Sequence, residues 1–241
     1  MKAVKAFAPD RIVLLPLYPQ YSTTTSASSL AEWALAARDA GLAAPATTLC
    51  CYPSEPDFVA AHADLLAEAL ARVPAGAMAR VLFSAHGLPE RVVKAGDPYQ
   101  HQVERSAAAV AAALGARMPE WRVTYQSRVG PLKWIGPETS AEIEAAARAG
   151  LAVVVVPIAF VSEHSETLVE LDIEYRHHAE AAGAVAYIRE QALAAHTKFI
   201  DSLAGLVARF AEAGGVRSEA DTRLCPGTYR GCPCAGTRSA A

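Results

Sequence analysis

The sequence lacks the features that mark several classes of protein. No apolar run reaches the roughly 20 residues that a membrane-spanning helix needs, and the N-terminal residues MKAVKAFAPDR lack the apolar core of a secretory signal. Lys and Arg are not clustered and the net charge is -3, so nothing predicts a nucleic-acid partner. No unit of roughly 20–50 residues repeats, which excludes a solenoid. We therefore expect a cytoplasmic globular protein.

Apolar strands alternate with amphipathic helices along the chain. Short β-branched or apolar runs predict strands at 11–18, 46–52, 80–83, 121–126, 153–156 and 184–189. Longer segments with helical spacing of apolar residues predict helices at 1–8, 30–40, 57–73, 99–114, 140–149 and 197–213. This alternation is typical of an α/β fold with parallel sheets and helices on both faces.

One stretch joins a buried strand to an acidic helix. Residues 153–156 are four valines, and Pro157 ends the strand because it has no N–H to donate. Ser162 is the predicted N-cap of the next helix. Three glutamates at i, i+4 and i+8 predict one acidic face on that helix: Glu166, Glu170 and Glu174. A solvated face explains this stripe, and so does a line of carboxylates that, with His164, handles a cation or protons.

Three further segments carry candidate binding residues. His86 follows the strand predicted at 80–83, where a side chain is poised to face a cleft, although a lone histidine there is more often structural. The loop at 18–29 is rich in hydroxyl groups, which either bind an anion or cap the following helix. Trp134 lies in a stiff loop with two Gly-Pro pairs and either covers a flat ligand or plugs the core.

The five cysteines need a separate explanation, because a reducing compartment disfavours a disulfide framework. Cys225, Cys232 and Cys234 crowd into a Gly- and Pro-rich tail, and Cys50 and Cys51 are the other two. Three ligands do not close a metal site, so a fourth would come from the earlier pair. The spacing leaves three readings open: an iron–sulfur cluster, a zinc ion, or unligated thiols.

Four segments together resemble the ferrochelatase family, whose members insert ferrous iron into protoporphyrin IX in the last step of haem synthesis. They follow the family's order: LLPLYPQYSTTT (14–25), FSAHGLP (83–89), YQSRVGPLKWIGP (125–137) and SEHSETLVELDIEY (162–175). The resemblance implies a chelatase-type fold, with two Rossmann-like domains of parallel strands and a porphyrin cleft between them. It also implies a lyase that acts on protoporphyrin IX and Fe(2+).

The resemblance assigns roles by residue match. It implies His86 as the proton acceptor and Glu166 as its partner, consistent with a histidine poised near neutral pH. Carboxylates and imidazoles also suit a divalent iron substrate, and the implied ligands are His86, Glu166, His164 and Glu170. The implied acidic line runs on through Asp172 and Glu174. The implied substrate-binding residues are Tyr18, Gln20, Tyr21, Ser22, Ser84 and Trp134.

The cysteine spacing resembles that of bacterial ferrochelatases that carry a [2Fe–2S] cluster. The resemblance implies ligation by Cys51, Cys225, Cys232 and Cys234, with Cys50 as the alternative to Cys51. The family draws one ligand from a distant internal position, and Cys51 is favoured because Tyr52 and Pro53 lead from it into a loop.

The chain departs from the family's pattern at its start. The YPQYS loop begins at Tyr18, whereas members of the family have most of a first domain before it. We therefore expect a remnant of the first domain at 1–40, the second domain at 41–196, and a C-terminal helix with the cysteine-rich tail at 197–241. Two alternatives remain: a related tetrapyrrole chelatase, and a truncated, non-catalytic remnant that binds porphyrin or an iron–sulfur cluster. A lipophilic substrate also allows peripheral contact with the inner membrane, and the sequence gives no oligomeric state.

Overall fold

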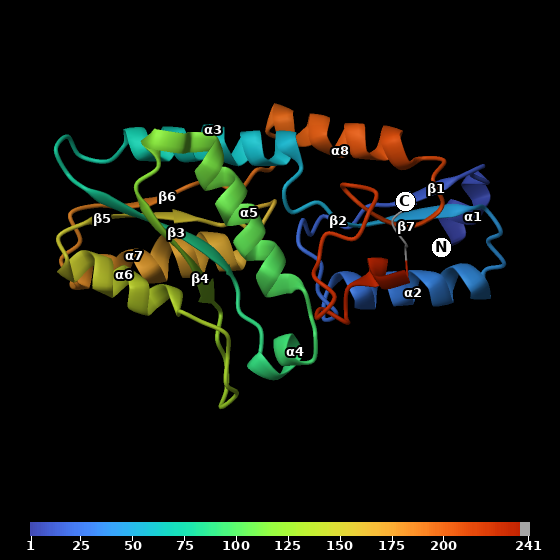
Figure 1. The fold of residues 1–241 in the computed structure, drawn as a ribbon, viewed down its shortest axis with the longest axis horizontal. Coiled ribbons are helices and arrows are strands. Elements are labelled where there is room, and N and C mark those ends of the chain that lie inside the picture. Colours follow the sequence, from blue (N-terminus) through green and yellow to red (C-terminus); the bar gives the residue numbers. More distant parts are fainter. Residues whose placement is uncertain (237–241) are drawn as a thin grey trace.

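Two parallel sheets form two lobes in the computed structural model, which describes residues 1–236 (Figure 1). The first sheet has the order β1-β2-β7, formed by Ile12–Leu14, Ala46–Cys51 and Gly215–Ser218. The second has the order β4-β3-β5-β6, formed by Glu120–Gln126, Ala79–His86, Ala152–Val156 and Tyr187–Arg189. Every pairing is parallel. The predicted α/β fold with parallel sheets is confirmed. Residues 237–241 of the expected tail lie outside the described part.

Helices cover both faces of each sheet. The α-helices are α1 (Lys2–Phe7), α2 (Ser26–Asp39), α3 (Pro56–Ala71), α4 (Glu90–Lys94), α5 (Tyr99–Leu114), α6 (Thr139–Arg148), α7 (Tyr175–Ala181) and α8 (Thr197–Phe210). Two short 3₁₀ helices, η1 (Gly115–Arg117) and η3 (Pro233–Gly236), and one π-helix, η2 (Glu166–Glu174), complete the list. In Figure 1, α3 and α5 lie on one side of the second sheet, and α6 and α7 lie on the other. Within residues 1–236, no helix is both long enough and apolar enough to cross a bilayer.

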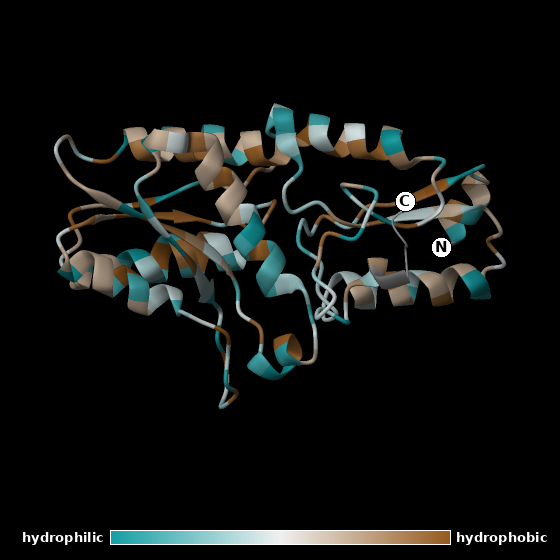
Figure 2. Cartoon of the chain, in the orientation of Figure 1, coloured by the Kyte–Doolittle hydropathy of each residue, from teal (hydrophilic) through white to brown (hydrophobic). Residues whose placement is uncertain are grey.

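The core of the second lobe explains its valine-rich strand. All five residues of β5 are buried, because helices cover that strand on both faces. Figure 2 shows β5 in hydrophobic colours along its length, whereas hydrophilic residues are frequent on the helices around the sheet. On α3 the apolar spacing buries Phe58 and Leu66 completely against the sheet. The predicted buried strand is thus confirmed.

The division between the lobes differs from the expected boundary after residue 40. Strand β2 pairs with β1 and β7, so residues 46–51 lie in the first sheet rather than with the second lobe. The described part of the tail returns to the same sheet through β7. β1 is also shorter than the expected strand at 11–18, because Pro16 has no N–H for the ladder. The first sheet is therefore assembled from three segments that lie far apart in the sequence.

The acidic helix differs from the expected one in its hydrogen bonding. An α-helix with Ser162 as its N-cap was expected, but Glu166–Glu174 forms a π-helix, and Ser162 lies before it in a bend. A π-helix closes each turn with i→i+5 hydrogen bonds, so it is wider than the α-helix that was expected. Such segments are frequent at functional sites. The expected α-helix is therefore wrong for this segment, and the contacts give Glu166, Glu170 and Glu174 three different surroundings.

Candidate active site

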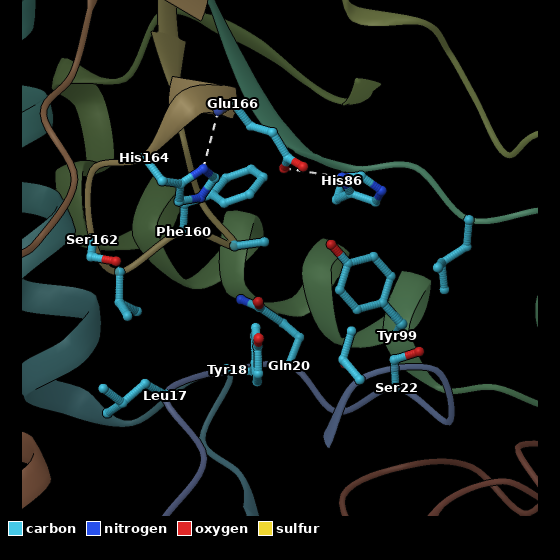
Figure 3. A pocket seen from close by; sticks show the side chains of 14 residues that line it. Leu17, Tyr18, Gln20, Ser22, His86, Tyr99, Phe160, Ser162, His164 and Glu166 are labelled. Carbon is cyan, nitrogen blue, oxygen red and sulfur yellow. Dashed lines mark hydrogen bonds and ion pairs between the residues drawn. The ribbon is translucent and has the colours of Figure 1, made fainter. Parts of the chain in front are cut away.

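A pocket of about 500 Å³ lies where the loop after β1 meets the carboxyl ends of β3 and β5 (Figure 3). A ligand site at this edge is common in open α/β sheets, and this volume suits a small molecule. Its lining comprises Leu17, Tyr18, Gln20, Ser22, Thr25, His86, Leu88, Tyr99, Ala159, Phe160, Val161, Ser162, His164 and Glu166. Among these described lining residues none is Lys or Arg. The pocket is therefore mostly apolar, with two imidazoles and one carboxylate.

His86 and Glu166 meet in this pocket although 80 residues separate them. His86 is the last residue of β3, and Glu166 is the first residue of η2. Nδ1 of His86 lies 3.2 Å from Oε2 of Glu166, and the two side chains are 40% and 37% exposed. A carboxylate at Nδ1 favours the tautomer with the proton on that nitrogen, which leaves Nε2 of His86 as a hydrogen-bond acceptor. The pair can thus take up a proton and exchange it with solvent.

His164 is held differently from His86. Its Nδ1 accepts the backbone N–H of Glu166 at 3.1 Å, and Phe160 packs against its ring edge with centroids 4.8 Å apart. This bond places the ring proton on Nε2, so His164 offers the pocket a donor. Ligation of iron through Nε2 would move the proton to Nδ1, against the N–H of Glu166. The implied role of His164 as an iron ligand stays a prediction, and it needs this hydrogen bond to break.

Glu170 lies beside the pocket with its carboxylate occupied. It accepts hydrogen bonds from Ser127 N at 2.8 Å, Ser127 Oγ at 2.5 Å, Gln126 Nε2 at 3.1 Å and Tyr175 Oη at 2.9 Å. Four donors suit an ionised carboxylate with about four lone-pair sites. An iron ion at Glu170 would have to displace some of them, so its implied role as a metal ligand also stays a prediction. The contacts show Glu170 fastening η2 to the end of β4.

Asp172 does not continue the implied acidic line, because it pairs with a buried arginine. Its Oδ2 accepts from NH2 of Arg189 at 2.7 Å, and Arg189 also donates to Glu163 at 3.0 Å. Glu163 accepts two more bonds, from Thr167 Oγ1 at 2.6 Å and from the Ala192 backbone at 2.9 Å. Arg189 therefore clamps the segment before η2 and the middle of η2 to the end of β6. Glu174 is exposed, and it completes a set of three glutamates with three different surroundings.

The predicted substrate-binding residues divide into two groups. Tyr18, Gln20 and Ser22 line the pocket, whereas Tyr21, Ser84 and Trp134 do not. Ser84 is fully buried and donates to Gln126 at 2.7 Å, and Gln126 in turn donates to the carbonyl of Glu166 at 3.3 Å. Ser84 therefore acts on the pocket only through its neighbours.

Trp134 and Tyr21 point to other parts of the molecule. The Trp134 ring lies 3.3 Å from the point that a Cβ on Gly87 would occupy, and it supports the turn after His86. Tyr21 packs among the cysteines, and burial, the largest cause, raises the pKa of its phenol to about 12. Sequence reasoning missed the pocket residues Tyr99 and Phe160. Phe160 could have been found, because it follows the end of a buried strand, where ligand sites are common. Tyr99 is the first residue of α5, and no sequence pattern marks that position as part of a pocket.

All five cysteines gather in one buried cluster beside the first sheet. Sγ of Cys50 lies 3.4 Å from Sγ of Cys51 and 3.4 Å from Sγ of Cys234. Neighbouring residues of a strand normally face opposite sides, but the pairing with β7 shifts between Leu49 and Cys51. This bulge lets both thiols reach the tail. The implied choice of Cys51 over Cys50 stays a prediction, since both sulfurs lie in the cluster.

The donor chemistry of this cluster fits the metals that the sequence suggested. Thiolates are the ligands of iron–sulfur clusters and of structural zinc. The bond with Cys225 is the largest effect lowering the pKa of the Cys232 thiol, which favours one thiolate in the cluster. However, no group of three or more His, Cys, Asp and Glu side chains within residues 1–236 has the arrangement of a ready metal site. The sulfurs suit a metal chemically and would have to rearrange to bind one.

The chain is similar to ferrochelatases over most of its length. A family model described as Ferrochelatase matches residues 1–211. The ferrochelatase of Caulobacter vibrioides strain NA1000 is 51% identical over 234 residues, which cover 97% of this chain and 66% of that protein. The ferrochelatase of Pelagibacter ubique is 43% identical over 235 residues, covering 97% of this chain and 67% of that protein. The chain thus spans about two thirds of the length of these curated relatives.

A solved structure is similar in fold. The protein described as SirB from Bacillus subtilis with Fe3+ matches with a TM-score of 0.59 and 14% identity, covering 88% of this chain and 75% of that one. At this identity the likeness concerns the arrangement of the sheets and helices alone.

Proposed function

Because this chain belongs to the ferrochelatase family, we propose that it inserts Fe(2+) into protoporphyrin IX to give protohaem. The observation that carries the proposal is the His86–Glu166 pair, 3.2 Å apart and half-exposed inside a mostly apolar pocket. Insertion of a divalent ion replaces two pyrrole N–H protons, so the site needs a proton acceptor beside an apolar surface for the macrocycle. The pair and its surroundings supply both.

His86 and Glu166 have different roles in the proposed reaction. Nε2 of His86 takes a pyrrole proton, and the resulting imidazolium donates through Nδ1 to the Glu166 carboxylate. Since both side chains reach solvent, the proton then leaves to water and the acceptor is restored for the second one. Glu166 has a second carboxylate oxygen, which is a suitable ligand for the incoming iron. The substrate iron therefore approaches from the Glu166 side.

The lining favours protoporphyrin over the alternative of a more acidic tetrapyrrole. None of the described lining residues is Lys or Arg, so a macrocycle with many carboxylates would find no countercharge inside the pocket. Exposed Leu17 and Tyr18 stand at the pocket mouth, where a lipophilic substrate would enter. We propose a cytoplasmic location with peripheral contact to the inner membrane, and these two exposed side chains support that contact. Sedimentation of the chain with uncharged phospholipid vesicles tests that contact, and failure to sediment would refute it.

Metallation of protoporphyrin tests the proposed function. The purified chain is mixed anaerobically with ferrous iron and protoporphyrin, and loss of the absorbance of free porphyrin is followed. We expect metallation well above the rate of a mixture without protein. A folded chain that binds protoporphyrin without metallating it would support the alternative of a non-catalytic remnant.

For the cysteine cluster we propose a [2Fe–2S] group held by Cys225, Cys232, Cys234 and Cys51. The proposal is supported by the buried donor set of five thiols and by the bulge that brings the β2 sulfurs to the tail. Such a group would tie the tail to the first sheet, and no step of metal insertion uses its electrons.

Chemical analysis of the chain tests the cluster. After anaerobic reconstitution we expect about two iron and two sulfide ions per chain, with loss of both in Cys225→Ser. Cys51→Ser should lose them and Cys50→Ser should keep them. The reverse result would make Cys50 the ligand. Zinc without sulfide would indicate a zinc site instead of the cluster. If neither iron nor zinc is found, the cysteines hold no metal.

A further inference from the structure

One buried side chain connects the cysteine cluster with the pocket. Gln102 is fully buried on α5, one turn after the pocket residue Tyr99. Its Oε1 accepts the backbone N–H of Tyr21 at 2.7 Å, and its Nε2 donates to Sγ of Cys225 at 3.2 Å. A backbone N–H has to meet the amide oxygen, so the amide orientation is fixed and its N–H faces the sulfur. Gln102 thus holds the cluster and the loop at once.

The loop end of this connection belongs to the pocket. Tyr21 stands between Gln20 and Ser22, which both line the cavity. A second bond from the same face of α5 holds Gln20, whose Nε2 donates to Ser106 Oγ at 2.8 Å. Because the Gln102 and Ser106 side chains lie four residues apart on one helix, they set the loop in register against α5. A shift at Gln102 would therefore move the residues that line the pocket.

The tail also reaches this loop from a second side. The Gly231 N–H donates to the carbonyl of Gly96 at 3.0 Å. The next residue, Asp97, accepts from Ser22 Oγ at 2.9 Å and from Thr23 N at 2.7 Å. A Cβ on Gly96 would lie 2.8 Å from the backbone nitrogen of Arg230, so the tail packs where no side chain fits. The tail and the pocket loop are therefore parts of one packed unit.

We propose that Gln102 is a positioning residue that couples Cys225 to the pocket loop at 18–22. The bond to the Cys225 sulfur holds the Gln102 amide in place, and the amide oxygen then holds the Tyr21 backbone. The inference rests on the proposed function only in taking protoporphyrin as the ligand of this loop.

A double-mutant cycle between Gln102→Leu and Cys225→Ala tests the coupling. The first readout is hydrogen exchange of the Tyr21 amide, and the second is the dissociation constant of protoporphyrin from fluorescence quenching. We expect Cys225→Ala, which removes one buried hydrogen bond, to speed the exchange and weaken binding by about tenfold. Gln102→Leu removes two such bonds and should do so by at least as much. The exchange rate and the dissociation constant of the double variant should differ from those of Gln102→Leu by less than about twofold, because the two residues act through one contact.

Two further variants separate coupling from general loosening. Gln102→Glu keeps an acceptor for Tyr21 but has no N–H for the sulfur, so in that background Cys225→Ala should change nothing. Gln100→Leu removes a bond to Glu104 at the surface of the same helix and should behave as wild type.

The coupling is overturned if Cys225→Ala leaves both readouts within about twofold of wild type, or if the two effects multiply in the double variant. Failure of the proposed function gives a different pattern. The wild-type chain would then not bind protoporphyrin. The exchange rate of the Tyr21 amide would still show that the effects of Gln102→Leu and Cys225→Ala are not additive. Circular dichroism of each variant confirms that the comparison is made between folded chains.

Discussion

We expect His86→Ala to metallate protoporphyrin at least about 100-fold more slowly than the wild-type chain, the usual contribution of a positioned proton acceptor. The variant removes the nitrogen that takes the pyrrole proton and leaves Glu166 without its partner at 3.2 Å. Half-exposure of the His86 side chain means that its truncation leaves no buried cavity, so the fold should persist. Loss of free-porphyrin absorbance with ferrous iron, compared at equal protein, measures the change.

The matched control is His177→Ala, an exposed histidine on α7 away from the pocket lining, which should metallate at the wild-type rate. Glu166→Gln keeps the shape of the partner but removes the charge that stabilises the imidazolium, and we expect about a tenfold or greater loss. If the glutamates are only a solvated face, Glu166→Gln will stay within about twofold of wild type. An active His86→Ala chain would remove His86 from the proton path.

Arg189→Met should lower the free energy of unfolding by about 3 kcal/mol, the lower end of the range for breaking a buried ion pair. Arg189 is only 7% exposed and holds Glu163 and Asp172 on either side of the start of η2. The variant leaves Glu163 without its cation and Asp172 with only the more distant Arg176 at 3.6 Å, and it loosens the segment that carries His164 and Glu166. Chemical denaturation at neutral pH measures the loss, and metallation should slow in parallel.

The pH dependence gives this prediction a second readout. Burial by itself would raise the pKa of Glu163, but bonds from Thr167, the Ala192 backbone and Arg189 lower it below its ordinary value of 4.5. A carboxyl with a lowered folded-state pKa adds stability above pH 4.5 that is lost as the pH falls through the folded value. The difference in the free energy of unfolding between wild type and Arg189→Met should therefore become smaller as the solution is made acidic.

The exposed pair of Arg148 and Glu144 on α6 provides the control for Arg189. Arg148→Met should change the free energy of unfolding by no more than about 0.5 kcal/mol, because an exposed pair is screened by water. An Arg189→Met chain as stable as this control would show that the clamp contributes nothing.

Most of the long strands and helices followed from local pattern, whereas α4, α7, β7 and the contacts of the site did not. Helix α5 has the predicted bounds, and β5 is buried as its valines indicated, because both depend on apolar spacing within one segment. The contact between His86 and Glu166 joins residues 80 positions apart. Periodicity carries no information on such a contact, and only the resemblance of whole motifs pointed to it.

The remaining differences have physical causes that a pattern does not report. The apolar and acidic spacing predicted a helix after Ser162, but local spacing does not report that η2 closes with i→i+5 hydrogen bonds or which partners surround each glutamate. Strand alternation predicts opposite faces for Cys50 and Cys51, and the bulge in β2 removes that distinction. In the loop at 18–25 the side-chain directions depend on partners in α5 and the tail. Tyr21 therefore turns to the cysteines while its two neighbours face the pocket.

The structure of the chain with metal-free protoporphyrin bound tests the proposed role of His86 most directly. We expect the macrocycle in the pocket, with Nε2 of His86 within about 3.2 Å of a pyrrole nitrogen or joined to it by one water. Nδ1 of His86 should keep its contact with Glu166. A porphyrin bound elsewhere, or held in the pocket with His86 turned away from its nitrogens, would contradict the assignment of His86 as the proton acceptor.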